Sequence, residues 1–102
     1  MLFRLRGDDG DSFLSGTWIG AEGKAQPLQR EDVVIKPLKL AMIAGRNIPV
    51  QWSLAVLSQS LNVTVVPLNP NSWMATSIEY WEGPVTAEGS HTGTGYLEMT
   101  GY

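Results

Sequence analysis

The last quarter of the chain, Glu79 to Tyr102, reads EYWEGPVTAEGSHTGTGYLEMTGY. Two runs that carry aromatic residues flank a stretch rich in Gly, Ser and Thr between Gly89 and Gly95, which is the pattern of two strands joined by a turn. This stretch predicts a β-hairpin that closes the chain, with the final run paired into a sheet. The rest of the fold is expected to assemble around it.

The sequence before this stretch predicts further antiparallel strands. The chain holds 11 Gly and 6 Pro among its 102 residues, and they separate short apolar runs. The clearest pair of strands is residues 50–57 and 61–66, where apolar and polar positions alternate with a period of two. Together these runs predict about seven or eight strands and no long helix.

The first strand is predicted at residues 2–6. Phe3 and Leu5 share one face of this run and Arg4 and Arg6 share the other, which indicates a half-buried strand. Asp9-Gly10 follows as a strong signal for a tight turn.

Three places leave the local structure open. Residues 38–44 favour a helix by composition, but the run is short and ends at Gly45, so it predicts either a strand continuation or a short helical turn. Pro37 predicts an edge or a corner of the sheet. Gly83-Pro84 predicts a kink or bulge in its strand, because proline cannot donate to the ladder.

This pattern predicts a single all-β domain, residues 1–102, folded as an antiparallel up-and-down β-barrel of about seven or eight strands. A barrel of that size holds either a filled core or one small ligand. We expect its interior wall to be apolar and to offer these ligand-binding residues: Trp52, Leu54, Val56, Val63, Val65, Trp81, Leu97 and Met99.

Charge and composition argue against several classes of function. The net charge is −3 and the seven Lys and Arg are scattered, so no basic stripe for nucleic acid is expected. The apolar runs are far shorter than the roughly 20 residues of a membrane span. The chain has no Cys and one His, so we expect no disulfide, metal or cofactor. It is expected to be soluble, and cytoplasmic by default.

Two motifs carry a family resemblance. Tyr80-Trp81-Glu82-Gly83 and the terminal run from Gly93 to Tyr102 resemble the C-terminal half of the hydroxyneurosporene synthase (carotenoid 1,2-hydratase)-like proteins, a lipocalin-like family often described as predicted secreted hydrolases. Weaker matches in the same order are Phe3-Arg4-x-Arg6 with Asp9-Gly10, Pro49-Val50-x-Trp52 and Val63-x-Val65-x-Pro67.

The resemblance implies a lipocalin-like barrel that corresponds to the second half of a two-barrel protein. A lone half would leave edge strands exposed, and these invite pairing with another copy. We therefore expect a homodimer, and the resemblance implies secretion as the alternative to a cytoplasmic location.

The resemblance also implies a catalytic acid. Glu82 would donate a proton to a carbon–carbon double bond, with Tyr80 and Trp52 as aromatic neighbours that stabilise a developing cation. The alternative is that Glu82 caps a buried turn. Alternation places Glu82 opposite Trp81, so Glu82 faces outward unless a bulge at Gly83-Pro84 resets the strand.

The only histidine, His91, lies beside Ser90 in the turn of the final hairpin. Sequence neighbours in a turn are not expected to adopt the geometry of a nucleophile and its base, so this pair is predicted to be an exposed loop.

Three hypotheses of function remain. The first is a lipocalin-like barrel that binds a small apolar molecule. The second is a hydratase or isomerase that acts on a terpenoid-like substrate through Glu82. The third is a structural assembly module with a filled core, in which the tryptophans pack the interior.

Overall fold

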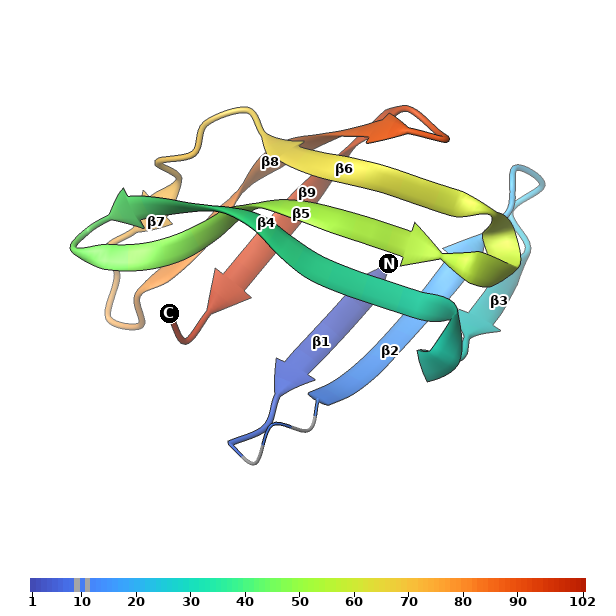
Figure 1. The fold of residues 1–102 in the computed structure, drawn as a ribbon, viewed down its shortest axis with the longest axis horizontal. Helices are drawn as coiled ribbons and strands as arrows, with labels where there is room; N and C mark the ends of the chain where they lie inside the picture. The colour runs from blue at the N-terminus through green and yellow to red at the C-terminus, as the bar shows by residue number, and fades with distance from the viewer. Residues whose placement is uncertain (9, 11) are drawn as a thin grey trace. The chain divides into compact units, whose positions relative to one another are not determined.

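A computed structural model describes residues 1–8, 10 and 12–102. Within these residues the chain forms nine strands and two short 3-10 turns, with every strand pairing antiparallel where a register is defined (Figure 1). The predicted all-β antiparallel class is confirmed. The turn expected at Asp9-Gly10 includes a residue outside the described part of the chain. Contacts divide the chain into two compact units, Met1–Val33 and Val34–Tyr102, and each is described by itself.

Unit 1 is a three-stranded sheet. Its strands are β1 (Leu2–Arg6), β2 (Ser12–Ile19) and β3 (Ala25–Leu28), in the order β1-β2-β3, followed by the 3-10 turn η1 (Arg30–Asp32). Gly16 pairs with Leu2 on one side and Leu28 on the other. A Cβ at Gly16 would lie 2.5 Å from Leu2 Cδ2, so the absence of a side chain at Gly16 leaves room for the Leu2 side chain.

The exposure of β1 corrects the sequence prediction. Phe3 and Leu5 are 51% and 54% exposed, whereas Leu2, on the other face of the strand, is half-buried. The prediction that the Phe3 and Leu5 face is the covered one is therefore wrong. Leu2 is half-buried, but Arg4 and Arg6 on its face are exposed, so alternation does not predict burial in this short strand.

Unit 2 is a six-stranded sheet. Its strands are β4 (Val33–Ile43), β5 (Arg46–Val56), β6 (Leu61–Pro67), β7 (Trp73–Met74), β8 (Tyr80–Gly89) and β9 (Gly93–Thr100), and the 3-10 turn η2 (Leu57–Gln59) joins β5 to β6. The order is β4-β5-β6-β8-β7, with β9 paired to β8. Because β9 occupies one edge of β8 along residues 80–87, β6 and β7 share the other edge.

The ambiguous residues 38–44 belong almost entirely to a strand. β4 runs through Ile43, and Pro37 lies within it, at the edge of the sheet as predicted. The chain then reverses through Ala44 and Gly45, which have φ of 50° and 76°. Two successive residues with positive φ are the signature of a type I′ turn, which suits the twist of a hairpin.

Of the kink or bulge predicted at Gly83-Pro84, the bulge is absent. Each β8 residue from Tyr80 to Ala87 pairs with one β9 residue, and the register does not slip. The neighbouring strand changes instead. Leu68 N–H donates to Pro84 O at 3.0 Å, the chain loops outward, and Ser72 O then accepts from Glu82 N–H at 3.0 Å before β7 begins.

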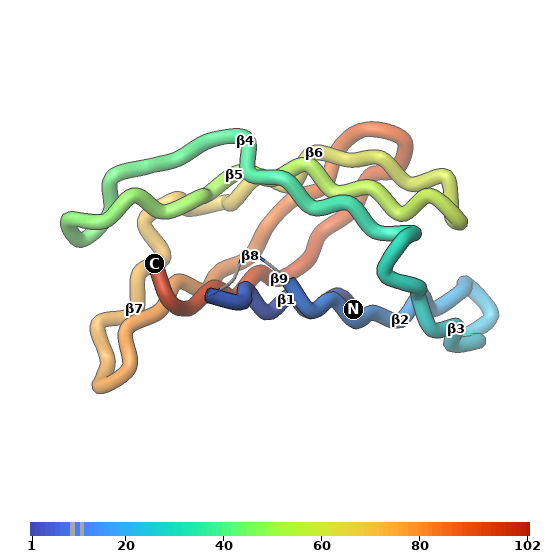
Figure 2. Tube along the Cα trace, turned by 60° about the horizontal axis from the view of Figure 1, so that its bottom comes forward, coloured from blue at the N-terminus to red at the C-terminus, as the bar shows by residue number. Residues whose placement is uncertain are grey.

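The core of unit 2 lies on one face of its sheet. Trp81 is fully buried, and its neighbours in the buried cluster come from β4, β5, β8 and β9. Figure 2 shows β8 and β9 sloping away from β5 and β6, so this sheet is strongly curved. The buried cluster is Ile43, Ile48, Val50, Trp81, Val85 and Met99.

Candidate functional site: the apolar face of unit 2

The strand registers place all eight predicted ligand-binding residues on one face of the unit 2 sheet. Trp52 pairs with Val65 and Leu54 with Val63. Val65 also pairs with Ala87, and along β8 every second residue from Ala87 back to Trp81 shares that face. We call this surface the apolar face: Trp52, Leu54, Val56, Val63, Val65, Trp81, Leu97 and Met99.

The apolar face has a buried part and an accessible part. Its buried members are Val56, Val63, Trp81 and Met99, whose exposed fractions are 7% or less. Its half-buried members are Trp52, Leu54, Val65 and Leu97. The second group therefore keeps apolar surface that is partly exposed.

Two indole rings on this face are fixed by their own hydrogen bonds. Trp52 Nε1 donates to Pro49 O at 3.0 Å, and Trp81 Nε1 donates to Pro70 O at 2.7 Å. Since both N–H groups are used within the chain, the half-buried Trp52 presents carbon surface to a molecule that contacts the face, and the fully buried Trp81 packs beneath it.

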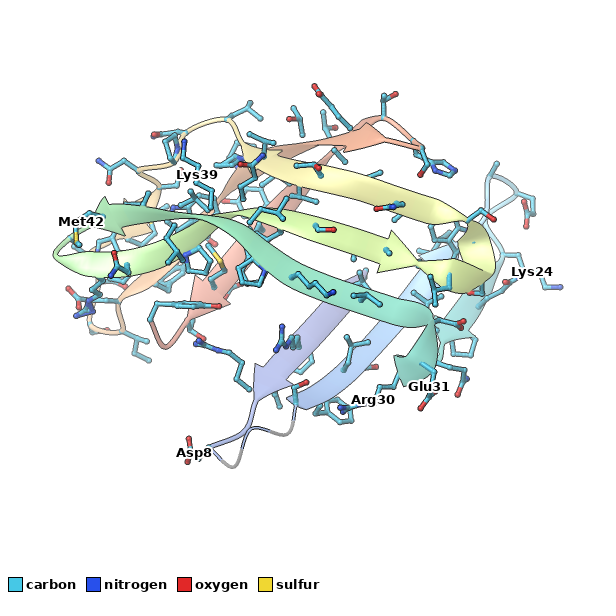
Figure 3. All side chains as sticks on the ribbon, viewed as in Figure 1. Asp8, Lys24, Arg30, Glu31, Lys39 and Met42 are labelled. Atoms are coloured by element: carbon cyan, nitrogen blue, oxygen red, sulfur yellow. The ribbon has the colours of Figure 1, made fainter. Side chains whose placement is uncertain are left out.

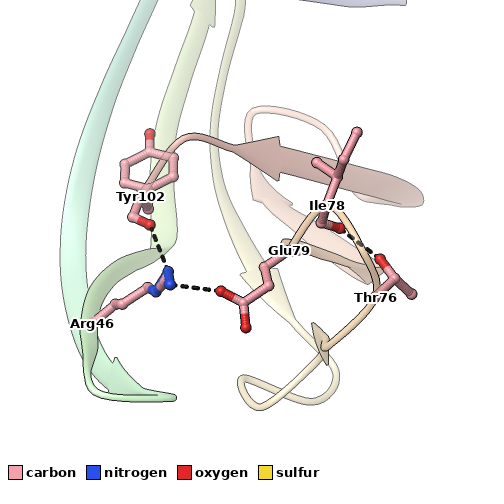
Figure 4. Close-up of polar contacts among 5 residues, drawn as sticks. All are labelled: Arg46, Thr76, Ile78, Glu79 and Tyr102. Atoms are coloured by element: carbon pink, nitrogen blue, oxygen red, sulfur yellow. Dashed lines mark hydrogen bonds and ion pairs between the residues drawn. The ribbon is translucent and has the colours of Figure 1, made fainter.

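A polar cluster around Arg46, which the sequence did not predict, lies at one end of the unit 2 sheet. Arg46 Nη2 bonds Glu79 Oε2 at 2.6 Å, and Arg46 Nη1 donates to the Tyr102 main-chain oxygen at 3.4 Å (Figure 4). The guanidinium carbon also lies 5.2 Å from the centre of the Trp73 ring, within cation–π range. We call this group, Arg46, Trp73, Glu79 and Tyr102, the Arg46 clasp. A hydrogen bond from Thr76 Oγ1 to Ile78 O at 2.5 Å orders the loop that carries Glu79.

Trp73 links the clasp to the apolar face. It pairs with Trp81 and packs against the buried cluster. Its Nε1 is buried and has no hydrogen-bond partner among the described residues. The sequence indicated no role for Trp73 beyond that of the tryptophans that pack a filled core.

The two predicted catalytic residues lie on the opposite face from the apolar wall. Tyr80 and Glu82 alternate with Trp81, and Glu82 pairs across the ladder with Glu98. The Tyr80 hydroxyl lies 3.5 Å from Glu82 Oε1, a long and weak hydrogen bond. The negative charge of Glu82 is the main cause that raises the pKa of Tyr80 above its usual 10.0, and partial burial adds to it. The sheet thus separates Glu82 and Tyr80 from Trp52.

The geometry of Ser90 and His91 differs from the sequence prediction. Both residues are exposed, as predicted, but Ser90 Oγ lies 2.9 Å from His91 Nδ1. Asn62 supplies the reason: its N–H donates to Ser90 Oγ at 2.7 Å, and its carbonyl accepts from Ser90 N–H at 3.0 Å. These bonds fix Ser90 so that adjacent residues do reach hydrogen-bonding distance. Among the described residues, no carboxylate orients the ring.

The described residues contain neither a cluster of metal ligands nor a helix that could span a membrane. Nowhere in residues 1–8, 10 and 12–102 do three His, Cys, Asp or Glu side chains gather as metal ligands would. No helix in this part of the chain has the length and apolar character that a membrane crossing requires.

Comparison with known proteins adds a family and a fold. A sequence model described as AttH-like matches residues 1–102. A crystal structure of a protein assigned as AttH from Nitrosomonas europaea matches with a TM-score of 0.84 and 24% sequence identity, over 99% of this chain and 34% of that one. The present chain therefore spans about a third of that protein's length, and at this identity the likeness concerns the fold alone. A search of curated proteins finds no match.

Proposed function

We propose that this chain, which belongs to the AttH-like family, binds a small apolar molecule against the apolar face of unit 2. The observation that carries the proposal is the register: four strands bring eight apolar side chains to one face, and four of these are only half-buried. Ligand sites in proteins are lined mostly by such side chains, with few polar groups.

The chemistry of this face favours a neutral, apolar ligand. The Trp52 and Trp81 N–H groups already bond to backbone carbonyls, so neither asks for an acceptor on the ligand. Removal of apolar surface from water then supplies the binding free energy, at about 25 cal/mol per Å². None of the eight side chains of the apolar face is charged, so they offer no ion-pair partner to a charged ligand.

The test is a titration of intrinsic tryptophan fluorescence with an apolar probe. We expect saturable quenching at about one probe per chain, and a loss of affinity of about ten-fold for Trp52→Ala, which removes one large side chain from the wall. Ser53→Ala is the matched control, since Ser53 neighbours Trp52 and points to the opposite face. A linear, non-saturating response in the unmodified chain rejects ligand binding.

A second candidate function rests on the contact between Tyr80 and Glu82. By resemblance to the hydroxyneurosporene synthase-like proteins, Glu82 would protonate a terpenoid double bond, and water would then add to the cation and return a proton to the Glu82 carboxylate. Because Glu82 points away from the apolar face, this activity requires a separate site on the opposite face of the unit 2 sheet. Glu82→Gln is expected to abolish hydration while probe binding on the apolar face is kept. Hydration at an unchanged rate in this variant excludes Glu82 as the acid.

The remaining candidate is an assembly module with a filled core, which acts through a homodimer. The buried half of the apolar face supports it, because Trp81 and Val56 are already shielded from water. An absence of probe binding together with a mass of two chains is the result that this candidate predicts.

A further inference from the structure

We infer that a second copy of this chain docks on one face of the unit 1 sheet. This inference goes beyond ligand binding and does not depend on it. The face is built by the register of β1 and β2, where Phe3 pairs with Ser15 and Leu5 with Phe13. Met1 extends the same row, because Met1 and Thr17 exchange two main-chain hydrogen bonds of 2.9 Å.

The large side chains on this face are exposed. Met1 is 89% exposed, Phe13 60% and Ile19 62%, and Phe3 and Leu5 are the two half-exposed residues that contradicted the sequence prediction. We call this group the unit 1 patch: Met1, Phe3, Leu5, Phe13 and Ile19.

The side chains of the unit 1 patch carry no charge, and the Met1 ammonium beside them donates to Thr17 O at 2.9 Å. The other strand residues on the same face are Ser15, Thr17, Ala25 and Pro27, so every strand position there is uncharged. The charged side chains of this unit that are labelled in Figure 3 lie outside its strands: Asp8 follows β1, Lys24 lies between β2 and β3, and Arg30 and Glu31 follow β3. An uncharged patch with a charged margin resembles the centre and rim of a protein interface.

The area of the patch fits a symmetric dimer. Its five side chains offer roughly 600 Å², on the basis of about 200 Å² for a large side chain that is fully exposed. That is the upper end of what a monomer usually leaves exposed. Two such patches placed face to face bury about 1,200 Å², where the range of specific interfaces begins.

The absence of charge selects the partner. In a two-fold dimer the same patch faces itself, so a charged side chain on it would meet a like charge, and the five side chains of the patch are all uncharged. Nucleic acid and anionic membranes attract basic surfaces, and the patch has no basic residue. A second copy of this chain is therefore the partner that this surface fits.

The test measures the mass of the 102-residue chain by sedimentation equilibrium across micromolar concentrations. We expect a monomer–dimer equilibrium, and Phe13→Lys should raise its dissociation constant about thirty-fold or more, as loss of a central aromatic anchor does. Leu5→Lys, on the neighbouring strand, should act in the same direction. Thermal unfolding of each variant shows that it still folds.

Leu57→Lys is the matched control. Leu57 is 62% exposed and lies in η2 of unit 2, so the same substitution there should leave the dimer intact. Three outcomes overturn the inference: a single-chain mass for the unmodified protein, polydisperse aggregates, or equal dissociation by Leu57→Lys. Probe binding by monomeric Phe13→Lys would show that the ligand site stands without the dimer.

Discussion

Ala44 occupies a backbone conformation that alanine rarely adopts. It precedes Gly45 in the turn between β4 and β5, and both have positive φ. For an L-residue with a Cβ this conformation costs about 1–2 kcal/mol, and asparagine adopts it more readily. Ala44→Asn should therefore raise the free energy of unfolding by about 0.5–1 kcal/mol, measured by urea denaturation. Ala21→Asn, at an exposed turn residue without positive φ, is the control, and an equal gain there would contradict the explanation.

Tyr80 makes part of the stability depend on alkaline pH. Glu82 is the main cause that raises the pKa of Tyr80 above 10.0 in the folded chain. Between the unfolded and the folded pKa, the folded chain holds more protons than the unfolded chain, so stability is full below about pH 10 and falls as pH rises through the folded value. Titration of phenolate absorbance should show one tyrosine ionising late, and Glu82→Gln should bring it back toward 10.0. An unchanged titration in Glu82→Gln would remove Glu82 as the cause.

At the scale of elements, the notable feature is the point where β6 leaves β8 and β7 replaces it. Ser72 lies against Gly83 where the chain returns to β8. A Cβ at Gly83 would lie 2.7 Å from Ser72 Oγ and 3.0 Å from Ser72 Cβ. Ser72 has little freedom to move, because its hydroxyl donates to Asn69 O at 2.9 Å. The close approach of Ser72 to β8 therefore depends on glycine at position 83.

Gly83→Ala should lower the free energy of unfolding by about 1–3 kcal/mol, since the added methyl group would be packed too closely against Ser72. Gly93→Ala is the matched control: it lies in β9, and an added Cβ meets nothing within 4 Å. The double variant Ser72→Gly, Gly83→Ala should recover part of the loss. Equal effects of the two single substitutions in a denaturation experiment would show that strand propensity, and not the contact with Ser72, is responsible.

Elements whose signal is local were predictable from the sequence. The hairpin of β5 and β6 and the closing hairpin of β8 and β9 are confirmed, because a period of two and turn residues specify both. The same alternation placed the eight residues of the apolar face together. It does not reveal which face of β1 is covered, since Leu2 and Phe3 are both apolar.

Features that join distant parts of the chain were not predictable. Ser90 reaches His91 because Asn62, 28 positions earlier, holds it. The sequence indicated an irregular strand at Gly83-Pro84. β8 itself pairs regularly with β9 there, and the irregularity lies on its other edge, where β6 ends and β7 takes its place. Both features depend on which strands pair across the sheet, and a local sequence pattern does not specify that pairing.

At the scale of the whole molecule, the two units differ in how much core each contains. All six residues of the buried cluster lie between positions 43 and 99, within unit 2. Among the described residues of unit 1, only Val33 is buried. Below about 40 residues a domain rarely folds without extra constraints.

A fragment of residues 34–102 should therefore fold alone, and residues 1–33 should not. We expect the larger fragment to keep the near-ultraviolet circular dichroism of buried Trp81 and to unfold cooperatively, while the smaller one gives a disordered spectrum. A larger fragment that melts without a transition would mean that its core is incomplete without unit 1.

The Arg46 clasp has a consequence for the rate of unfolding. It joins positions separated by 33 and 56 residues, so its contacts are expected to form late, after the transition state for folding. Its ion pair is more than a third exposed, and a pair of this kind contributes about 0.2–1 kcal/mol. Arg46→Met should accelerate unfolding about two- to five-fold in stopped-flow experiments and leave the folding rate nearly unchanged, whereas Lys39→Met, which removes an exposed charge from β4, should alter neither. The clasp would then affect the lifetime of the folded state more than the rate at which that state forms. A lower folding rate in Arg46→Met would instead show that the clasp is already formed in the transition state for folding.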